Sequence, residues 1–492
     1  MSAPTGRRVF VVKKQTSAIA LFVRDEAHDI ISWLSWHIAL GFNKIFVYDD
    51  QSSDGTYEIA QSCAEIYGVE TLRASAVSGF YHDRKQNCYF DAIGKAKGRY
   101  DWIALLDSDE YVSLDGSDDI NAFLNTFSET DTGIALNWCI YGSSEKILKD
   151  KVPTYQSFTY RSQPDLEDNT FVKRFVRPEA VDLSESSSHK LSLSYGNYVD
   201  ALGRPVHWTS EETKDVLWEK AKINHYICRS REHFVDWVRS RPEPEASHGL
   251  DYWSHFDRND NHAPQNPDRV HAANIAYDTI KKAVFHSSMH NFLVRGNSLG
   301  KEKNPLLPTR RVEFFHLKNF QGDDLCVDTI DGYLIQGAGR ERVLAAIPYA
   351  SNRIWIFRNP SLASSNIHFH IKNSSCHAYC YDLEFEANEM DASIFIKSPQ
   401  TGKYLSAPSE GNRLEFTADE AVGQRKFHFS EKISETVFHG EHEYSEADMV
   451  YYILNSGGSF SYEEFTLKFA NLNRAEMENL RTLFGQQIRA IL

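Results

Sequence analysis

The chain has 492 residues, of which 41% are hydrophobic and 25% charged, enough for roughly two to four globular domains. Its formal net charge of −15 argues against the basic footprint of a general nucleic-acid-binding protein. The seven cysteines are scattered and odd in number, so we expect no disulfide framework and a reducing compartment.

The N-terminal sequence MSAPTGRRVFVVKK is basic and lacks an apolar run of secretory length. We therefore expect no signal peptide, no transmembrane segment and a cytoplasmic location. The basic residues leave peripheral contact with a membrane open; they are Arg7, Arg8, Lys13 and Lys14.

The region from residue 17 to residue 107 alternates short β-rich runs with amphipathic helical runs. Strands are predicted at 18–24, 44–50, 69–75 and 101–107, and helices at 26–41, 53–68 and 83–98. This alternation predicts crossover connections and an α/β fold with a mostly parallel sheet. Ligands of such sheets bind at the carboxyl ends of the strands.

Acidic residues follow two of these predicted strands. Asp49 and Asp50 end the second, and Asp107, Asp109 and Glu110 follow the fourth. Because strand side chains alternate, an Asp-x-Asp pair sets both carboxylates on one side. Such a pair can hold Mg²⁺ or Mn²⁺, which keeps positions open for substrate phosphates. The same motif also occurs as an ordinary polar turn.

The middle of the chain is mixed in pattern. A basic, β-rich stretch with Lys173, Arg174 and Arg177 is either a phosphate or anion contact or a solvated edge strand. Residues 242–311 have poor periodicity and are predicted to be a linker or an excursion. Their histidines have no fixed metal-ligand spacing.

Residues 312–432 change to short strands and turns. The segments FHLKNFQGDDLCVDTIDGYL (315–334) and IFIKSPQTGKYLSAPSEGNRLEF (394–416) are similar, and 369–381 begins in the same way. Such repeats predict a repetitive β architecture. The pattern resembles the β-trefoil domains of lectins and fascin-like proteins, with a jelly roll or sandwich as the alternative. The domain either binds carbohydrate or is a structural appendage.

The last residues, 433–492, are predicted to be amphipathic and helical. We expect them to pack on a domain or to pair subunits of an oligomer.

The N-terminal region resembles a known enzyme family. The segment FVRDEAHDIISWLSWHIALGFNKIFVYDDQSSDGT (22–56), the strand end DWIALLDSDEY and the later INHYICRSREHF (223–234) resemble family-2-type glycosyltransferases with the GT-A fold. The helix carrying Trp33 or Trp36, His37, Gly41 and Phe42 is most similar to the group with the family 92 galactosyltransferases. The resemblance implies a GT-A domain over residues 1–241.

The resemblance also implies roles for individual residues. Asp49 and Asp50 are expected to meet the uridine or ribose of a sugar nucleotide, and Asp25 or Glu26 to lie near the base. Arg84 and Gln86 open a helix, whose N-terminus favours phosphate. The diphosphate and metal pair is Asp107 and Asp109, and His225 resembles a third metal ligand.

Inversion at the anomeric carbon needs a carboxylate base beside the acceptor hydroxyl. Glu145 is the preferred candidate, and Glu110 is either a second one or a support for the metal site. Trp138 is a candidate for stacking on an acceptor sugar, and His189 for holding an anionic acceptor.

Together these features predict a Mn²⁺- or Mg²⁺-dependent inverting enzyme that transfers a hexose, with galactose as one candidate, from a UDP-sugar to a glycan. The alternative is a lectin-like protein whose glycosyltransferase domain has lost activity. A nucleotidyltransferase would need a basic, Gly-rich loop after the first strand, whereas VRDEAHD is acidic.

Overall fold

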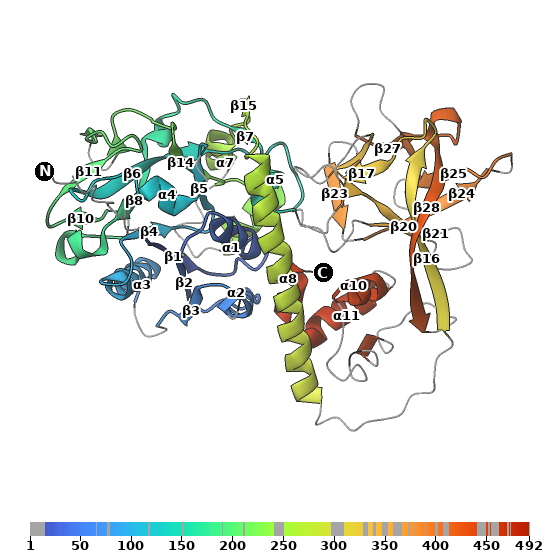
Figure 1. Cartoon of the computed structure of the whole chain (residues 1–492), viewed down its shortest axis with the longest axis horizontal. Coiled ribbons are helices and arrows are strands. Elements are labelled where there is room, and N and C mark those ends of the chain that lie inside the picture. Colours follow the sequence, from blue (N-terminus) through green and yellow to red (C-terminus); the bar gives the residue numbers. More distant parts are fainter. Residues whose placement is uncertain are drawn as a thin grey trace, which may run out of the picture.

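The computed structural model describes most of the chain between residues 15 and 491. Left out within that span are 65, 76–78, 117–118, 150–151, 189, 210–211, 241–249, 297–308, 328–332, 338–340, 347–352, 358–366, 372–373, 379, 389, 399–401, 407–412, 440–448, 451–452, 454–461, 470–471 and 473. An α/β part comes first, followed by a long helix, a β part and C-terminal helices (Figure 1).

The α/β part is built on a mostly parallel sheet with the strand order β3-β2-β1-β4-β8-β6-β14-β5 and β11 beside β6. Its strands are β1 (Ser17–Val23), β2 (Lys44–Asp49), β3 (Val69–Arg73), β4 (Trp102–Leu106), β5 (Glu110–Leu114), β6 (Asp131–Ile140), β8 (Val172–Val176), β11 (Asn197–Val199) and β14 (Ala221–His225). The first four are mutually parallel, and β8 runs antiparallel between β4 and β6. The predicted α/β class is confirmed.

Helices cover both faces of this sheet. They are α1 (Ile30–Ala39), α2 (Thr56–Ala64) and α3 (Tyr81–Ala96), which alternate with the strands as predicted. In β1, Ile19 and Leu21 join the core with α1 and α2, whereas Ala20 and Phe22 join a second core with α3. Burial on both faces explains why the parallel strands read as continuous apolar runs.

Shorter elements complete the α/β part. The helices are α4 (Ile120–Leu124), α5 (Thr154–Ser157), α6 (Arg231–Ser240) and α7 (Leu250–Phe256). The strands are β7 (Tyr160–Arg161), β9 (Val181–Asp182), β10 (Ser192–Leu193), β12 (Trp208–Thr209), β13 (Glu212–Thr213) and β15 (Asn261–His262).

The region expected to be a linker or an excursion contains a long helix. It is α8 (Pro267–Gly296), which packs against α1. Its residues Ile280 and Phe285 are buried in the core that β1 shares with α1 and α2. Among the described residues, no helix is long and apolar enough to cross a bilayer.

The C-terminal helices return to the α/β part. They are α10 (Tyr462–Phe469), α11 (Arg474–Phe484) and the short 3₁₀ helix η6 (Gln486–Ala490). Phe465, Leu480 and Ile488 lie in the core that α1 and α8 share. The described contacts therefore agree with the expectation that this segment packs on a domain, and the β part lies between α8 and these helices in the sequence (Figure 1).

The β part has a core of its own. Its strands are β16 (Thr309–Asn319), β17 (Leu325–Val327), β18 (Leu334–Gln336), β19 (Glu341–Arg342), β20 (Leu344–Ala346), β21 (Arg353–Phe357), β22 (Ile367–Ile371), β23 (Ser374–Ala378), β24 (Cys380–Ala387), β25 (Ile394–Lys397), β26 (Tyr404–Ser406), β27 (Glu415–Ala418) and β28 (Lys426–His439). Strands β16, β20, β21, β24, β25 and β28 pair in a closed ring. The pairs β17–β18, β22–β23 and β26–β27 are antiparallel.

Candidate functional site

An acidic turn, residues 107–110, connects β4 to β5 and is held in place by α1. The indole Nε1 of the fully buried Trp33 donates to the backbone oxygens of Asp107 and Glu110, at 3.0 and 2.9 Å. The backbone N–H of Asp107 donates to Glu110 Oε2 at 2.9 Å, which closes the turn. The sequence linked Trp33 to this site only through the family resemblance; its role as a support for the turn is visible only in the structure.

The next turn of α1 fixes the neighbouring strand. Trp36 Nε1 donates to the backbone oxygen of Val112 at 2.7 Å. His37 Nε2 accepts the backbone N–H of Val112 at 3.3 Å, and its Nδ1 lies 2.9 Å from the backbone oxygen of Trp33. Burial lowers the pKa of His37 to about 3, so the ring is neutral and serves as a structural link between helix and strand.

Asp109 and His225 face one another across the site. His225 ends β14 and pairs with Glu110 on β5, which brings its Nε2 to 3.4 Å from Asp109 Oδ2. Burial by itself raises the pKa of Asp109, but the charge and hydrogen bond of His225 lower it well below the usual range. Among the described residues, His225 Nδ1 is buried and has no hydrogen-bond partner.

Two lysines hold the carboxylate of Asp107. Lys85 Nζ from α3 lies 2.6 Å from Oδ1, and Lys173 Nζ from β8 lies 2.8 Å from Oδ2. Lys173 also lies 2.8 Å from Glu110 Oε2. Burial opposes the charge of Lys173, yet Asp107 and Glu110 together raise its pKa. The sequence offered Lys173 as an anion contact or as part of a solvated edge strand, and it gave no reason to single out Lys85. The edge-strand alternative is wrong, because β8 lies between β4 and β6 and Lys173 is buried.

Two of the three predicted metal ligands are placed so that they could bind one divalent ion. Asp109 Oδ2 and His225 Nε2 are an oxygen and a nitrogen donor at a separation near the roughly 3 Å expected of neighbouring ligands on one ion. These two residues fit a divalent cation. Asp107 does not offer a free oxygen in this arrangement, because each of its oxygens is paired with a lysine.

The aspartates expected to bind the sugar nucleotide, which is the donor substrate, lie at the carboxyl ends of β1 and β2. Arg73 NH1 lies 2.5 Å from Oδ2 of the fully buried Asp49. Arg84 forms a two-pronged contact with Asp50, with both nitrogen–oxygen distances at 2.7 Å. Asp25, whose φ is 51°, accepts the backbone N–H of Ser53 at 2.8 Å. The structure therefore gathers these residues at one edge of the sheet; Gln86 lies partly buried on α3.

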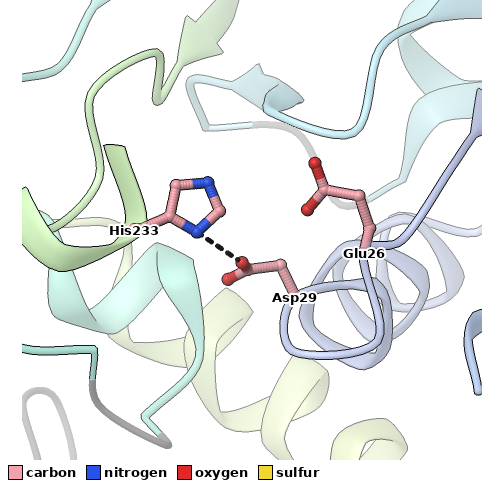
Figure 2. A group of neighbouring side chains, drawn as sticks. All are labelled: Glu26, Asp29 and His233. Carbon is pink, nitrogen blue, oxygen red and sulfur yellow. Dashed lines mark ion pairs between the residues drawn. The ribbon is translucent and has the colours of Figure 1, made fainter. Parts of the chain in front are cut away.

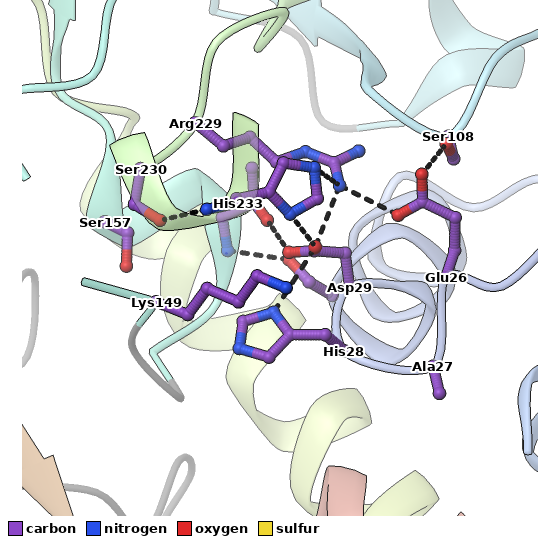
Figure 3. A network of polar contacts seen from close by, with 12 residues as sticks. Glu26, Ala27, His28, Asp29, Ser108, Lys149, Ser157, Arg229, Ser230 and His233 are labelled. Atoms are coloured by element: carbon purple, nitrogen blue, oxygen red, sulfur yellow. Dashed lines mark hydrogen bonds and ion pairs between the residues drawn. The ribbon is translucent and has the colours of Figure 1, made fainter. Parts of the chain in front are cut away.

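Glu26 belongs to a separate charged cluster that reaches the acidic turn. Figure 2 shows Glu26, Asp29 and His233, whose ligand atoms all lie within 4.8 Å of one another. Arg229 NH1, however, lies 2.8 Å from both carboxylates (Figure 3). Glu26 also accepts from Ser108 Oγ at 3.0 Å. Since a guanidinium already supplies the positive charge here, we interpret this cluster as a tether for the acidic turn.

Local sequence pattern does not single out Arg229, Asp29 or His233. Arg229 is 3% exposed and lies after β14, with a φ of 50°. Its partners are about 200 positions away in the sequence. An isolated arginine in a loop carries no local signal for such a contact.

Only some of the residues predicted to bind the acceptor or to act as the catalytic base can be placed relative to His225. Glu145 is exposed in the loop that follows β6, and it and Ser144 have φ values of 61° and 51°. The Trp138 ring lies 4.3 Å from the His225 ring and 5.1 Å from that of Phe171. Glu110, in contrast, is fully buried. His189 lies outside the described residues.

The chain is similar to known proteins over the part that carries this site. Residues 17–249 match the model of Glycosyltransferase family 92. This part of the chain is therefore similar to a family 92 glycosyltransferase domain. A family 92 protein of Oryza sativa subsp. japonica is 23% identical over 234 residues, which span 46% of this chain and 37% of that protein. The chain thus spans well under half of this relative's length.

Solved structures also show a weak likeness to this chain. TarS residues 1–349 from S. aureus, in complex with UDP-GlcNAc, is 12% identical, with 58% of this chain and 76% of that chain covered and a TM-score of 0.28. Glucosyl-3-phosphoglycerate synthase from Mycobacterium tuberculosis, with Mn²⁺ and UDP, is 16% identical, with 36% and 64% covered and a TM-score of 0.22. At these TM-scores, neither likeness adds to the assignment.

Proposed function

We propose that the chain is a metal-dependent inverting glycosyltransferase with a GT-A fold. It transfers a hexose, with galactose as one candidate, from a UDP-sugar to a glycan. The observation that carries the proposal is the pair Asp109 and His225, 3.4 Å apart, on the turn after β4 and at the end of β14. The family 92 match over the same residues supports the class of reaction.

The residues of the chain suit a diphosphate leaving group. Asp109 and His225 would hold the ion, which when bound supplies charge that stabilises the departing diphosphate. Lys85 and Lys173 already lie at the acidic turn, paired with Asp107. On donor binding, we expect their ammonium groups to lie near the phosphates and add to the same charge stabilisation.

Transfer with inversion is a single displacement. Glu145 accepts the proton of the acceptor hydroxyl, and the hydroxyl oxygen bonds to the anomeric carbon. The bond from that carbon to the diphosphate oxygen breaks, and UDP leaves with the electron pair. Glu145 is supported by its exposure and by two successive residues with positive φ, since strained backbone clusters at functional sites.

The acceptor is proposed to lie over Trp138 and Phe171. Phe171 is 37% exposed, and its ring lies 5.1 Å from that of Trp138, beside His225. Aromatic faces of this kind suit the apolar face of a sugar ring. His189 stays a candidate for an anionic group of the acceptor.

We further propose that the β part is a β-trefoil that binds carbohydrate. The support is the closed ring of six strands together with three two-stranded pairs, each lying in the sequence between two strands of the ring. A glycan-binding domain on the same chain would hold a polymeric acceptor near the catalytic domain.

The test is UDP release from UDP-galactose, UDP-glucose and UDP-N-acetylglucosamine, with a glycan panel, in Mn²⁺ and in EDTA. We expect EDTA to abolish release, and Asp109→Asn to lower kcat/KM by at least about 100-fold. Asp115→Asn is the matched control, since Asp115 is exposed and pairs with Lys222 at 3.5 Å. Full activity in EDTA or in Asp109→Asn contradicts the metal role.

One observation favours a second candidate, an inactive, lectin-like protein. Both oxygens of Asp107 are paired with lysines, which leaves that carboxylate unavailable to a donor. UDP-sugar binding without UDP release for any acceptor in the panel would support this candidate over the enzyme.

A further inference from the structure

The loop that follows β2 forms hydrogen bonds with residues at the ends of β1 and β2, where the sugar nucleotide is expected to bind. This loop, residues 50–55, is called the donor loop below. The backbone N–H of Ser53 donates to Asp25 Oδ1 at 2.8 Å, and the backbone N–H of Ala27 donates to Asp54 Oδ2 at 2.8 Å. The backbone N–H of Ser52 donates to Asp49 Oδ2 at 3.1 Å. The position of the donor loop therefore sets the positions of two groups expected to meet the nucleotide.

The back of the donor loop meets the C-terminal end of the chain. Gly55 has a φ of +103°, and a Cβ there would lie 2.5 Å from the backbone nitrogen of Gln487 and 2.9 Å from the backbone carbonyl carbon of Gln486. Contacts this close to backbone atoms leave no room for a side chain. The two backbones are therefore in direct contact, although more than 400 positions separate them in the sequence.

The C-terminal side of this contact is anchored independently of the loop. Gln487 Nε2 donates to Ser288 Oγ of α8 at 2.9 Å, in a buried hydrogen bond. Ile488 is fully buried in the core that α1 and α8 share. A cavity of about 170 Å³ adjoins the contact and is lined in part by Ser52, Ser53 and Gln487. Gly55 is thus the point of closest approach shown for the donor loop, and open space lies beside it.

We propose that η6 is a positioning element of the donor site. It holds the donor loop from behind, so that Asp25 and Asp49 keep the positions in which they meet the nucleotide. The binding part of this inference rests on the proposed function, while the support of the loop by η6 does not. The residues that act are Gln486, Gln487 and Ile488, and they act through the donor loop.

The first experiment compares two buried aliphatic residues of the C-terminal helices. Ile488→Ala loosens η6, whereas Leu480→Ala removes an equally buried side chain from α11 that does not line the cavity beside the donor loop. Hydrogen–deuterium exchange of residues 50–55 and calorimetric binding of UDP with Mn²⁺ are measured on the full chain. We expect Ile488→Ala to speed exchange of the loop and raise the Kd of UDP roughly tenfold. Leu480→Ala should lower stability without either effect.

The second experiment perturbs the loop side of the contact. Gly55→Ala forces the two backbones apart, whereas Gly98→Ala places a side chain at a positive φ of +72° with no atom of the described residues within 4 Å of its Cβ. We expect only Gly55→Ala to raise the Kd of UDP and to speed exchange in residues 485–491. The pair separates the contact from the general cost of a left-handed backbone in a non-glycine residue.

The outcomes separate the two proposals. Unchanged loop exchange in Ile488→Ala, or an equal increase in Leu480→Ala, overturns the support by η6. If loop exchange rises but UDP affinity stays the same, the support exists and its role in donor binding is refuted. If the wild-type chain binds no UDP with Mn²⁺, the proposed function fails, and the exchange data still decide whether η6 holds the loop.

Discussion

The variant Trp33→Phe tests whether Trp33 positions the acidic turn for activity, in addition to stabilising the fold. The indole N–H of Trp33 reaches two backbone oxygens, those of Asp107 and Glu110. Asp107 O keeps the backbone N–H of Glu110 at 3.1 Å as a second partner, so the main loss falls on Glu110 O. Leaving a buried carbonyl without this donor costs about 1–3 kcal/mol.

The matched control is Trp36→Phe. Trp36 is 2% exposed, lies one helical turn further on, and donates a single N–H to the backbone oxygen of Val112 at 2.7 Å. The same chemistry predicts the same loss of about 1–3 kcal/mol in the free energy of unfolding. The two variants differ in the backbone they release: Trp33 holds the turn with Asp109, whereas Trp36 holds the middle of β5.

Urea unfolding and steady-state UDP release measure the two effects separately. We expect similar free energies of unfolding for both variants, and a fall in kcat/KM of roughly tenfold or more for Trp33→Phe alone, because a small misplacement of catalytic groups is costly. Equal loss of kcat/KM in both variants would refute the reasoning, as would wild-type activity in Trp33→Phe.

Three further predictions concern ionisable side chains. Because burial lowers the pKa of His37 to about 3, the folded state binds fewer protons than the unfolded state as the pH falls below about 6.5. The contribution of His37 to the free energy of unfolding should therefore fall by about 2 kcal/mol between pH 7 and pH 5. In urea titrations, His37→Gln should make the free energy of unfolding less dependent on pH over this range. Lys173→Met leaves Glu110 as a buried, unpaired carboxylate and should cost about 3–5 kcal/mol in the free energy of unfolding, whereas Lys222→Met should cost less than about 1 kcal/mol. Arg84→Lys removes the two-pronged contact with Asp50 and should weaken UDP binding by roughly tenfold in calorimetry, a result that unchanged affinity would contradict.

The sequence by itself determined the local elements of the first hundred residues and the chemistry at their ends. Hydrophobic periodicity and cap residues depend on near neighbours, so the strands and helices from Ser17 to Leu106 could be predicted. Because parallel strands have their carboxyl ends at one edge of the sheet, the sequence also predicted that Asp49, Asp50 and Asp107 lie at the same edge. His225 was reached only through a family resemblance, because the pairing of β14 with β5 has no local signal.

The tertiary structure alone decided which charges neutralise one another and which segments support the site. Lys85 and Lys173 meet at Asp107 because α3 and β8 both pass the end of β4, and Arg229 reaches Glu26 across 203 positions. The contact of Gln487 with Gly55 depends on the path of the chain through α8 and the β part and back. Local pattern encodes which residues are buried, but the partner of a buried group is set by the packing of elements far apart in the sequence.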